Sequence, residues 1–150
     1  MVSRQPGDFL KKHRKVYLDT SVFIYFVERH PRYFDICDMI FKDMEAGGIE
    51  GSTSTLTLLE ILVHPYRMKK EELVLKFYSL FTTYPHLRWI QLSLDISDLA
   101  ARLRAEHNLK TPDAVQMASA ISGGATGFVC NDKVFGRVRD IECLILSDWA

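Results

Sequence analysis

Short segments that favour strands alternate with longer segments of helical periodicity along the whole chain. The predicted strands span residues 16–19, 51–53, 88–92, 127–130 and 143–146. The predicted helices span residues 21–28, 31–45, 56–63, 71–82, 93–107 and 111–122. Strands separated by helices imply right-handed crossovers, so the pattern predicts an α/β sandwich with a mainly parallel sheet of about five strands.

Proline and capping residues set the predicted ends of several helices. Pro65 is expected to halt the helix before it, because proline lacks the backbone N–H that an interior helical position needs. Ser93 is a candidate N-cap for the helix that runs to about residue 107, and Thr111 is a candidate N-cap with Pro112 in the first turn. These signals predict where helices meet the edges of the sheet.

Composition narrows the class of protein. The chain has 150 residues, of which 47% are hydrophobic and 25% are charged, as in ordinary globular domains. The three cysteines lie in apolar segments without a zinc-binding spacing, which predicts reduced thiols and a cytoplasmic protein. An apolar run near the ~18 residues of a membrane span is absent from the sequence, so no membrane association is expected.

The predicted domain covers residues 15–150, and residues 1–14 form an N-terminal extension. Disorder, RNA binding through Lys11, Lys12 and Arg14, and tethering of a partner are the alternatives for this extension. The formal net charge of zero excludes the simplest argument for a nucleic-acid partner, a strongly basic chain. Basic runs such as residues 11–15 are still compatible with an acidic metal-binding pocket that is surrounded by positively charged side chains.

Four acidic residues stand where a carboxylate is hard to explain by solubility alone, namely Asp19, Glu60, Asp113 and Asp132. Asp19 and Asp132 follow predicted strands, and ligands of parallel sheets bind beyond the carboxyl ends of the strands. Glu60 lies within an apolar helical segment, and Asp113 opens a helix. Buried acids without a cationic partner take up protons, so a cluster of them implies a bound divalent metal.

Each of the acids also has an ordinary explanation when taken alone. Glu60 is compatible with a solvent-facing helix position, Asp113 with a first-turn acid, and Asp132 with a turn residue. Three further residues are candidates to support the acids: Thr20, Ser21 and Asn131. The hydroxyls of Thr20 and Ser21 are alternatively helix caps, and Asn131 alternatively shapes its turn.

Four sequence motifs carry a resemblance to a known family. Leu18-Asp19-Thr20-Ser21-Val22, Leu59-Glu60-Ile61-Leu62, the segment 111–118 (TPDAVQMA) and Val129-Cys130-Asn131-Asp132 occur in an order that resembles PIN-domain ribonucleases, especially VapC toxins of toxin–antitoxin pairs. The resemblance extends over nearly the whole chain from about residue 16. It implies a three-layer α/β/α sandwich whose acidic pocket holds Mg²⁺ or Mn²⁺.

The resemblance also implies an activity and partners. We expect an endoribonuclease in which Asp19, Glu60, Asp113 and Asp132 hold the metal and hydrolyse RNA phosphodiester bonds. A homodimer and a protein antitoxin that blocks the pocket are expected as well. The alternatives are a housekeeping RNA-processing or DNA-acting PIN nuclease, and a catalytically silent PIN module that binds nucleic acid or protein.

Overall fold

Five parallel strands form the centre of the protein. The computed structural model describes residues 5–149. The strands are β1 (Lys15–Leu18), β2 (Glu50–Ser54), β3 (Leu87–Ile90), β4 (Gly127–Cys130) and β5 (Glu142–Ile145). They lie in the order β3-β2-β1-β4-β5, and every pair is parallel. β1 is central, with Val16 opposite Gly51 on one side and Gly127 on the other.

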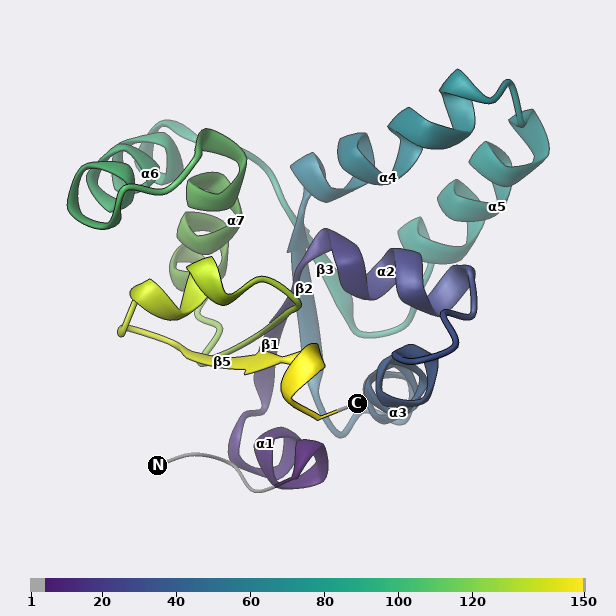
Figure 1. Ribbon diagram of the computed structural model, residues 1–150, viewed down its shortest axis with the longest axis horizontal. Helices are drawn as coiled ribbons and strands as arrows, with labels where there is room; N and C mark the ends of the chain where they lie inside the picture. Colours follow the sequence, from purple (N-terminus) through teal and green to yellow (C-terminus); the bar gives the residue numbers. More distant parts are fainter. Residues whose placement is uncertain (1–4, 150) are drawn as a thin grey trace.

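Helices cover both faces of this sheet, and the predicted three-layer α/β/α sandwich is confirmed (Figure 1). One layer contains α2 (Thr20–Val27), α3 (Phe34–Glu45), α4 (Thr55–Arg67) and α5 (Glu71–Thr82). The opposite layer contains α6 (Leu94–His107), α7 (Thr111–Ser122) and the 3₁₀ helix η1 (Lys133–Arg137). The short α1 (Pro6–Lys12) precedes β1, and the 3₁₀ helix η2 (Leu146–Asp148) follows β5.

The central strands are buried on both faces, as expected for a parallel sheet that helices cover on both sides. Along β1, Val16 and Leu18 belong to the hydrophobic core under α2, α3 and α5, whereas Tyr17 belongs to the core under α6 and α7. β4 alternates in the same way, with Val129 facing the first core and Phe128 the second. The two cores fix the sheet between the layers and hold its carboxyl edge in place.

Most predicted elements are present within a few residues of their expected bounds, but two of the expected helix ends are wrong. α4 continues through Pro65 to Arg67, because the proline lies near the end of the helix and its missing N–H affects only the carbonyl of Ile61. Thr111 is the first residue of α7 and not its cap; the capping position is Lys110, whose side chain makes no capping hydrogen bond.

The segment before β1 contains a helix within the described residues. α1 places Phe9 in the core with 1% of its surface exposed. Phe9 packs against β4 at Gly127, where a Cβ atom would lie 2.7 Å from the Phe9 ring. Residues 1–4 of the predicted extension lie outside the described residues, and the division at residue 14 stays a prediction.

The packing of Phe9 makes α1 a stabilising part of the domain. We expect Phe9→Ala to lower the free energy of unfolding by about 3 kcal/mol, because it removes a buried ring and leaves a cavity over β4. Urea denaturation measures this change. Leu94→Ala is the control, since Leu94 is 91% exposed and its truncation should change stability little. Equal stability of Phe9→Ala and the wild type would contradict the packing role.

Candidate active site

Two of the four predicted acids follow neighbouring strands at the carboxyl edge of the sheet. Asp19 comes directly after β1, and its backbone N–H donates to the carbonyl of Val129 at 3.0 Å, which extends the pairing with β4 by one residue. Asp132 follows β4 by two residues. Because β1 and β4 are adjacent and parallel, both aspartates lie at the same edge.

The other two acids reach this edge from helices on opposite layers. α4 begins directly after β2, and the Ser54 hydroxyl caps it by accepting from the N–H of Leu56 at 3.0 Å. Glu60 lies on the second turn of α4 and is half-buried. Asp113 lies in the first turn of α7, also half-buried, where the helix dipole favours a carboxylate.

The charges of the four acids act on one another. Burial raises the pKa of Asp19 from its ordinary 3.8 to about 7, and the nearby charges of Glu60 and Asp113 contribute to this rise. Burial also raises the pKa of Asp113, as do the charges of Asp132 and Glu60. Among residues 5–149, none of the four acids forms a salt bridge with a lysine or arginine. The structure therefore brings all four acids within electrostatic reach without a paired cation.

The acids are not held in a preassembled ligand set. In the described part of the chain, no three Asp, Glu, His or Cys side chains meet at metal-binding distance. Asp132 is exposed, and its carboxylate accepts from the N–H of Val134 at 3.0 Å, which caps η1. A metal would have to draw these side chains together.

The three predicted supporting residues have different contacts. Ser21 donates from its hydroxyl to Asp19 at 3.3 Å, and Thr20 donates to Glu60 at 2.9 Å. Asn131 contacts neither acid. Its amide nitrogen donates to the Tyr25 hydroxyl at 3.1 Å, and its carbonyl oxygen accepts from the N–H of Ser147 at 2.9 Å, so its contacts hold the loop after β4.

One residue that contacts Glu60, Gln116, was not among the candidates from the sequence. Gln116 is 1% exposed, and its amide nitrogen donates to Glu60 at 2.8 Å. A signal was present in the sequence, because Gln116 is a long polar side chain among the apolar residues of segment 114–118. Such a residue in the buried face of a helix needs polar partners.

The chemistry of this donor set fits a hard divalent cation. Carboxylate oxygens are the ligands that Mg²⁺ and Mn²⁺ prefer, and histidine or thiol ligands are not required. The raised pKa of Asp19 fits as well, since uncompensated negative charge resists ionisation until a cation is present. Asp19, Glu60 and Asp113, which influence one another electrostatically, are candidates to hold such an ion, as is the exposed Asp132.

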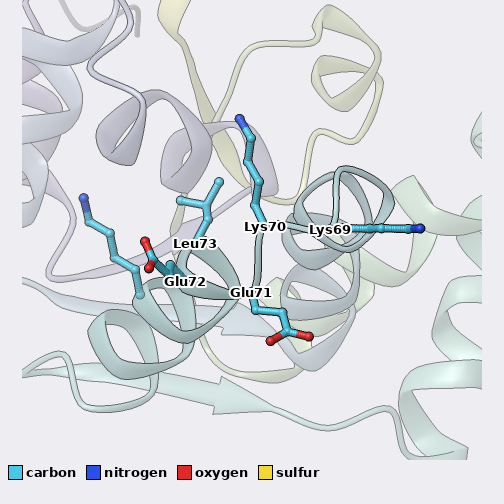
Figure 2. A pocket seen from close by; sticks show the side chains of 6 residues that line it. Lys69, Lys70, Glu71, Glu72 and Leu73 are labelled. Carbon is cyan, nitrogen blue, oxygen red and sulfur yellow. The ribbon is translucent and has the colours of Figure 1, made fainter.

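A separate hollow of about 660 Å³ lies at the turn between α4 and α5 (Figure 2). Its lining includes Lys69, Lys70 and Lys76 together with Glu71 and Glu72. Figure 2 shows Lys69, Lys70 and Glu71 pointing away from one another. Because the charges are mixed and these side chains diverge, we regard this hollow as solvated surface.

An all-parallel sheet with carboxylates gathered at its carboxyl edge defines the class of α/β/α domain that binds ligands at that edge. A family model described as the PIN domain matches residues 16–141, and the chain belongs to this family. PIN domains form a family of nucleases that generally use divalent metal ions. Membership therefore assigns this protein to the general class of hydrolases that act on nucleic acids.

Solved structures with the same fold come from two toxin–antitoxin systems. The chain is similar to a chain in the crystal structure of VapBC2 from Rickettsia felis, which is bound to a DNA fragment from the VapBC2 promoter. The two chains share 20% sequence identity with a TM-score of 0.68, and the match covers 87% of this chain and 98% of that chain. It is also similar to one in a toxin–antitoxin complex from Klebsiella pneumoniae, with 20% identity, a TM-score of 0.62, and coverage of 84% and 94%. No curated protein matches the sequence.

Proposed function

We propose that this protein is a divalent-metal-dependent endoribonuclease, the toxin of a toxin–antitoxin pair that acts in the cytoplasm. The observation that supports the nuclease most strongly is the mutual electrostatic coupling of four acids that have no paired cation. Family membership and the fold of the toxin–antitoxin structures favour the same assignment. Among the helices of residues 5–149, none combines the length and apolar character that a bilayer crossing requires.

In this proposal Asp19, Glu60 and Asp113 would hold Mg²⁺ or Mn²⁺, and Asp132 would contribute from the exposed side of the site. A metal held there would supply an activated water and would stabilise the leaving oxygen of a phosphodiester. Ser21 orients the Asp19 carboxylate through its hydrogen bond, and Thr20 does the same for Glu60. Asp132 is exposed, which is compatible with the approach of a polynucleotide backbone from that side.

Two exposed lysines support binding of a phosphate backbone at this site. Lys110 directly precedes α7, and its positive charge opposes the rise in the pKa of Asp113. Lys133 follows Asp132 at the start of η1. Positive charge at the rim attracts the phosphates of RNA while the negative pit retains the metal.

The proposed partners are a protein antitoxin and a second copy of the chain. Exposed apolar side chains lie along α4, the following turn and α5, which is compatible with contacts to a protein partner. These side chains are Leu59, Val63, Tyr66, Met68, Leu75 and Tyr78. An antitoxin that places an arginine among the carboxylates would compete with the metal for them.

The direct test is cleavage of a pool of structured RNAs by the purified protein with Mg²⁺ or Mn²⁺, beside a DNA pool of matched sequence. We expect cuts in RNA that EDTA abolishes and that excess Mn²⁺ restores. Cleavage of DNA alone would indicate a DNA-acting nuclease. A folded protein that binds no divalent metal and cuts neither pool would contradict the proposal and favour a silent binding module.

Asp113→Asn offers a matched comparison with Asp95→Asn, since both aspartates lie in the first turn of a helix. We expect Asp113→Asn to lower the cleavage rate by roughly 100-fold or more, because it removes a charge that would hold the metal. Asp95→Asn should leave the rate unchanged. Initial rates at fixed Mg²⁺ measure the difference, and equal rates for the two variants would exclude Asp113 from the site.

A further inference from the structure

A continuous chain of buried and partly buried hydrogen bonds connects the centre of the sheet to the acidic edge. The amide nitrogen of Gln116 donates to Glu60 at 2.8 Å and to the Thr20 hydroxyl at 3.2 Å. On the other side of the amide, the Gln116 oxygen accepts from the Tyr17 hydroxyl and, at 3.3 Å, from the Thr57 hydroxyl. Gln116, which lies on α7, therefore contacts α2 and α4 of the opposite layer and the central strand β1.

The donors around Gln116 allow only one orientation of its amide. The Tyr17 side chain is fully buried, and its hydroxyl has one proton to donate. The Tyr17 oxygen already accepts from the backbone N–H of Ser54 at 3.0 Å, which leaves its proton for Gln116. The opposite orientation would place the amide oxygen against the Glu60 carboxylate. The amide oxygen would then also lose the hydrogen bonds that Tyr17 and Thr57 donate to it.

The hydrogen bonds occupy one oxygen of Glu60 and leave the other available. Thr20 and Gln116 both donate to Oε1, at 2.9 and 2.8 Å. Oε2 accepts no hydrogen bond from any residue between 5 and 149. Two donors on one oxygen fix the plane of the carboxylate and direct the second oxygen away from them.

The same network fixes the start of the helix that carries Glu60. Ser54 is the N-cap of α4, and its backbone N–H donates to the Tyr17 hydroxyl. Thr57 lies one turn before Glu60 on the same helix. The Thr53 hydroxyl lies 2.7 Å from that of Thr57 and also donates to the carbonyl of Leu18, beside Asp19. The position of Glu60 relative to Asp19 thus depends on contacts that never reach solvent.

We propose that Gln116 is a positioning residue that holds Glu60 with a single carboxylate oxygen directed to the metal. This inference rests on the proposed function, since it concerns the same site. The amide itself touches neither metal nor RNA. Its role is to supply the hydrogen bonds that keep a half-buried glutamate in one rotamer before the metal binds, which lowers the cost of assembling the site.

The test compares Gln116→Met with Leu103→Ala. Methionine keeps the length of the glutamine side chain without its hydrogen bonds, whereas Leu103→Ala loosens the core under α6 and α7 and leaves every hydrogen bond of the network in place. Mn²⁺ affinity is measured by titration calorimetry, and the free energy of unfolding is measured in EDTA. RNA cleavage is then measured across a range of Mn²⁺ concentrations.

We expect Gln116→Met to raise the Kd for Mn²⁺ roughly 10- to 100-fold, as is usual when a group that orients a metal ligand is lost. Cleavage should recover to within about tenfold of the wild type when Mn²⁺ is raised to saturation. Leu103→Ala should bind Mn²⁺ with an affinity within about threefold of the wild type even though it is less stable. Tyr17→Phe, which removes one of the two hydrogen bonds donated to the amide oxygen, should weaken Mn²⁺ binding in the same direction as Gln116→Met.

Wild-type Mn²⁺ affinity in both Gln116→Met and Tyr17→Phe would overturn this inference and leave the proposed function intact. An equal loss of affinity in Leu103→Ala would overturn it too, since general loosening of the core would then explain the effect. If the wild type binds no Mn²⁺, the proposed function fails and this inference fails with it. Should Gln116→Met not fold, Tyr17→Phe decides by the same affinity measurement.

Discussion

Asp19→Asn is expected to reduce metal-dependent RNA cleavage by at least about 1000-fold while the protein stays folded. Burial raises the pKa of Asp19, and the charges of Glu60 and Asp113 add to this rise. Asparagine keeps the shape of the side chain but offers the metal a neutral oxygen in place of a carboxylate. The loss should therefore appear in metal affinity as well as in the cleavage rate.

Asp140→Asn is the matched control for this substitution, since Asp140 is exposed and precedes β5 at the opposite edge of the sheet. Its cleavage rate should equal that of the wild type. The two variants are compared by initial cleavage rates and by calorimetric titration with Mn²⁺. Retention of more than a tenth of the activity by Asp19→Asn would exclude Asp19 from the metal site, and unfolding of that variant would indicate a structural role.

The second large effect is a dependence of stability on pH that Asp19 causes in the metal-free protein. Its pKa is about 7 in the folded protein, against 3.8 as its ordinary value. Between these values the folded state keeps a proton that the unfolded state has lost. The contribution of Asp19 to stability is therefore fully present below about pH 3.8 and decreases as the pH rises towards 7.

We expect the free energy of unfolding in EDTA to fall by up to about 1.4 kcal/mol per pH unit within this window through Asp19 alone. Asp19→Asn removes the titrating group, so the difference between the two proteins isolates this effect from other titrating residues. Urea titrations from pH 4.5 to 7.5 measure it, and saturating Mn²⁺ should flatten the wild-type curve. Parallel curves for wild type and variant in EDTA would refute the raised pKa.

The order of strands and helices could be predicted because each signal was local. Gly127–Cys130 is a strand and Glu71–Thr82 is a helix at the expected bounds, since turn residues and periodicity mark their ends. α1 was not predicted as a helix, because its position depends on contact between Phe9 and a strand more than one hundred residues later. The predicted helix end at Pro65 was wrong for a related reason, since the effect of a proline depends on how near it lies to the end of the helix.

The proximity of the four acids followed from their positions relative to strand ends and helix starts. The hydrogen bonds around Glu60 could not be predicted in this way, because they depend on the directions of side chains from three elements, α2, α4 and α7. Gln116 contacts Glu60 across 56 residues of sequence, and no spacing rule links such positions. Likewise, the sequence left the role of Asn131 open, and its contacts with Tyr25 and Ser147 became apparent only in three dimensions.

The strand order has a consequence for synthesis of the protein on the ribosome. β1 pairs with β2 early, but its other edge stays open until β4 has been made, and β5 then pairs with β4. A nascent chain that ends before residue 127 lacks both β4 and the last of the acids. The proposed nuclease therefore stays inactive through most of its own translation, and a partner that is already present can meet the chain as it becomes complete.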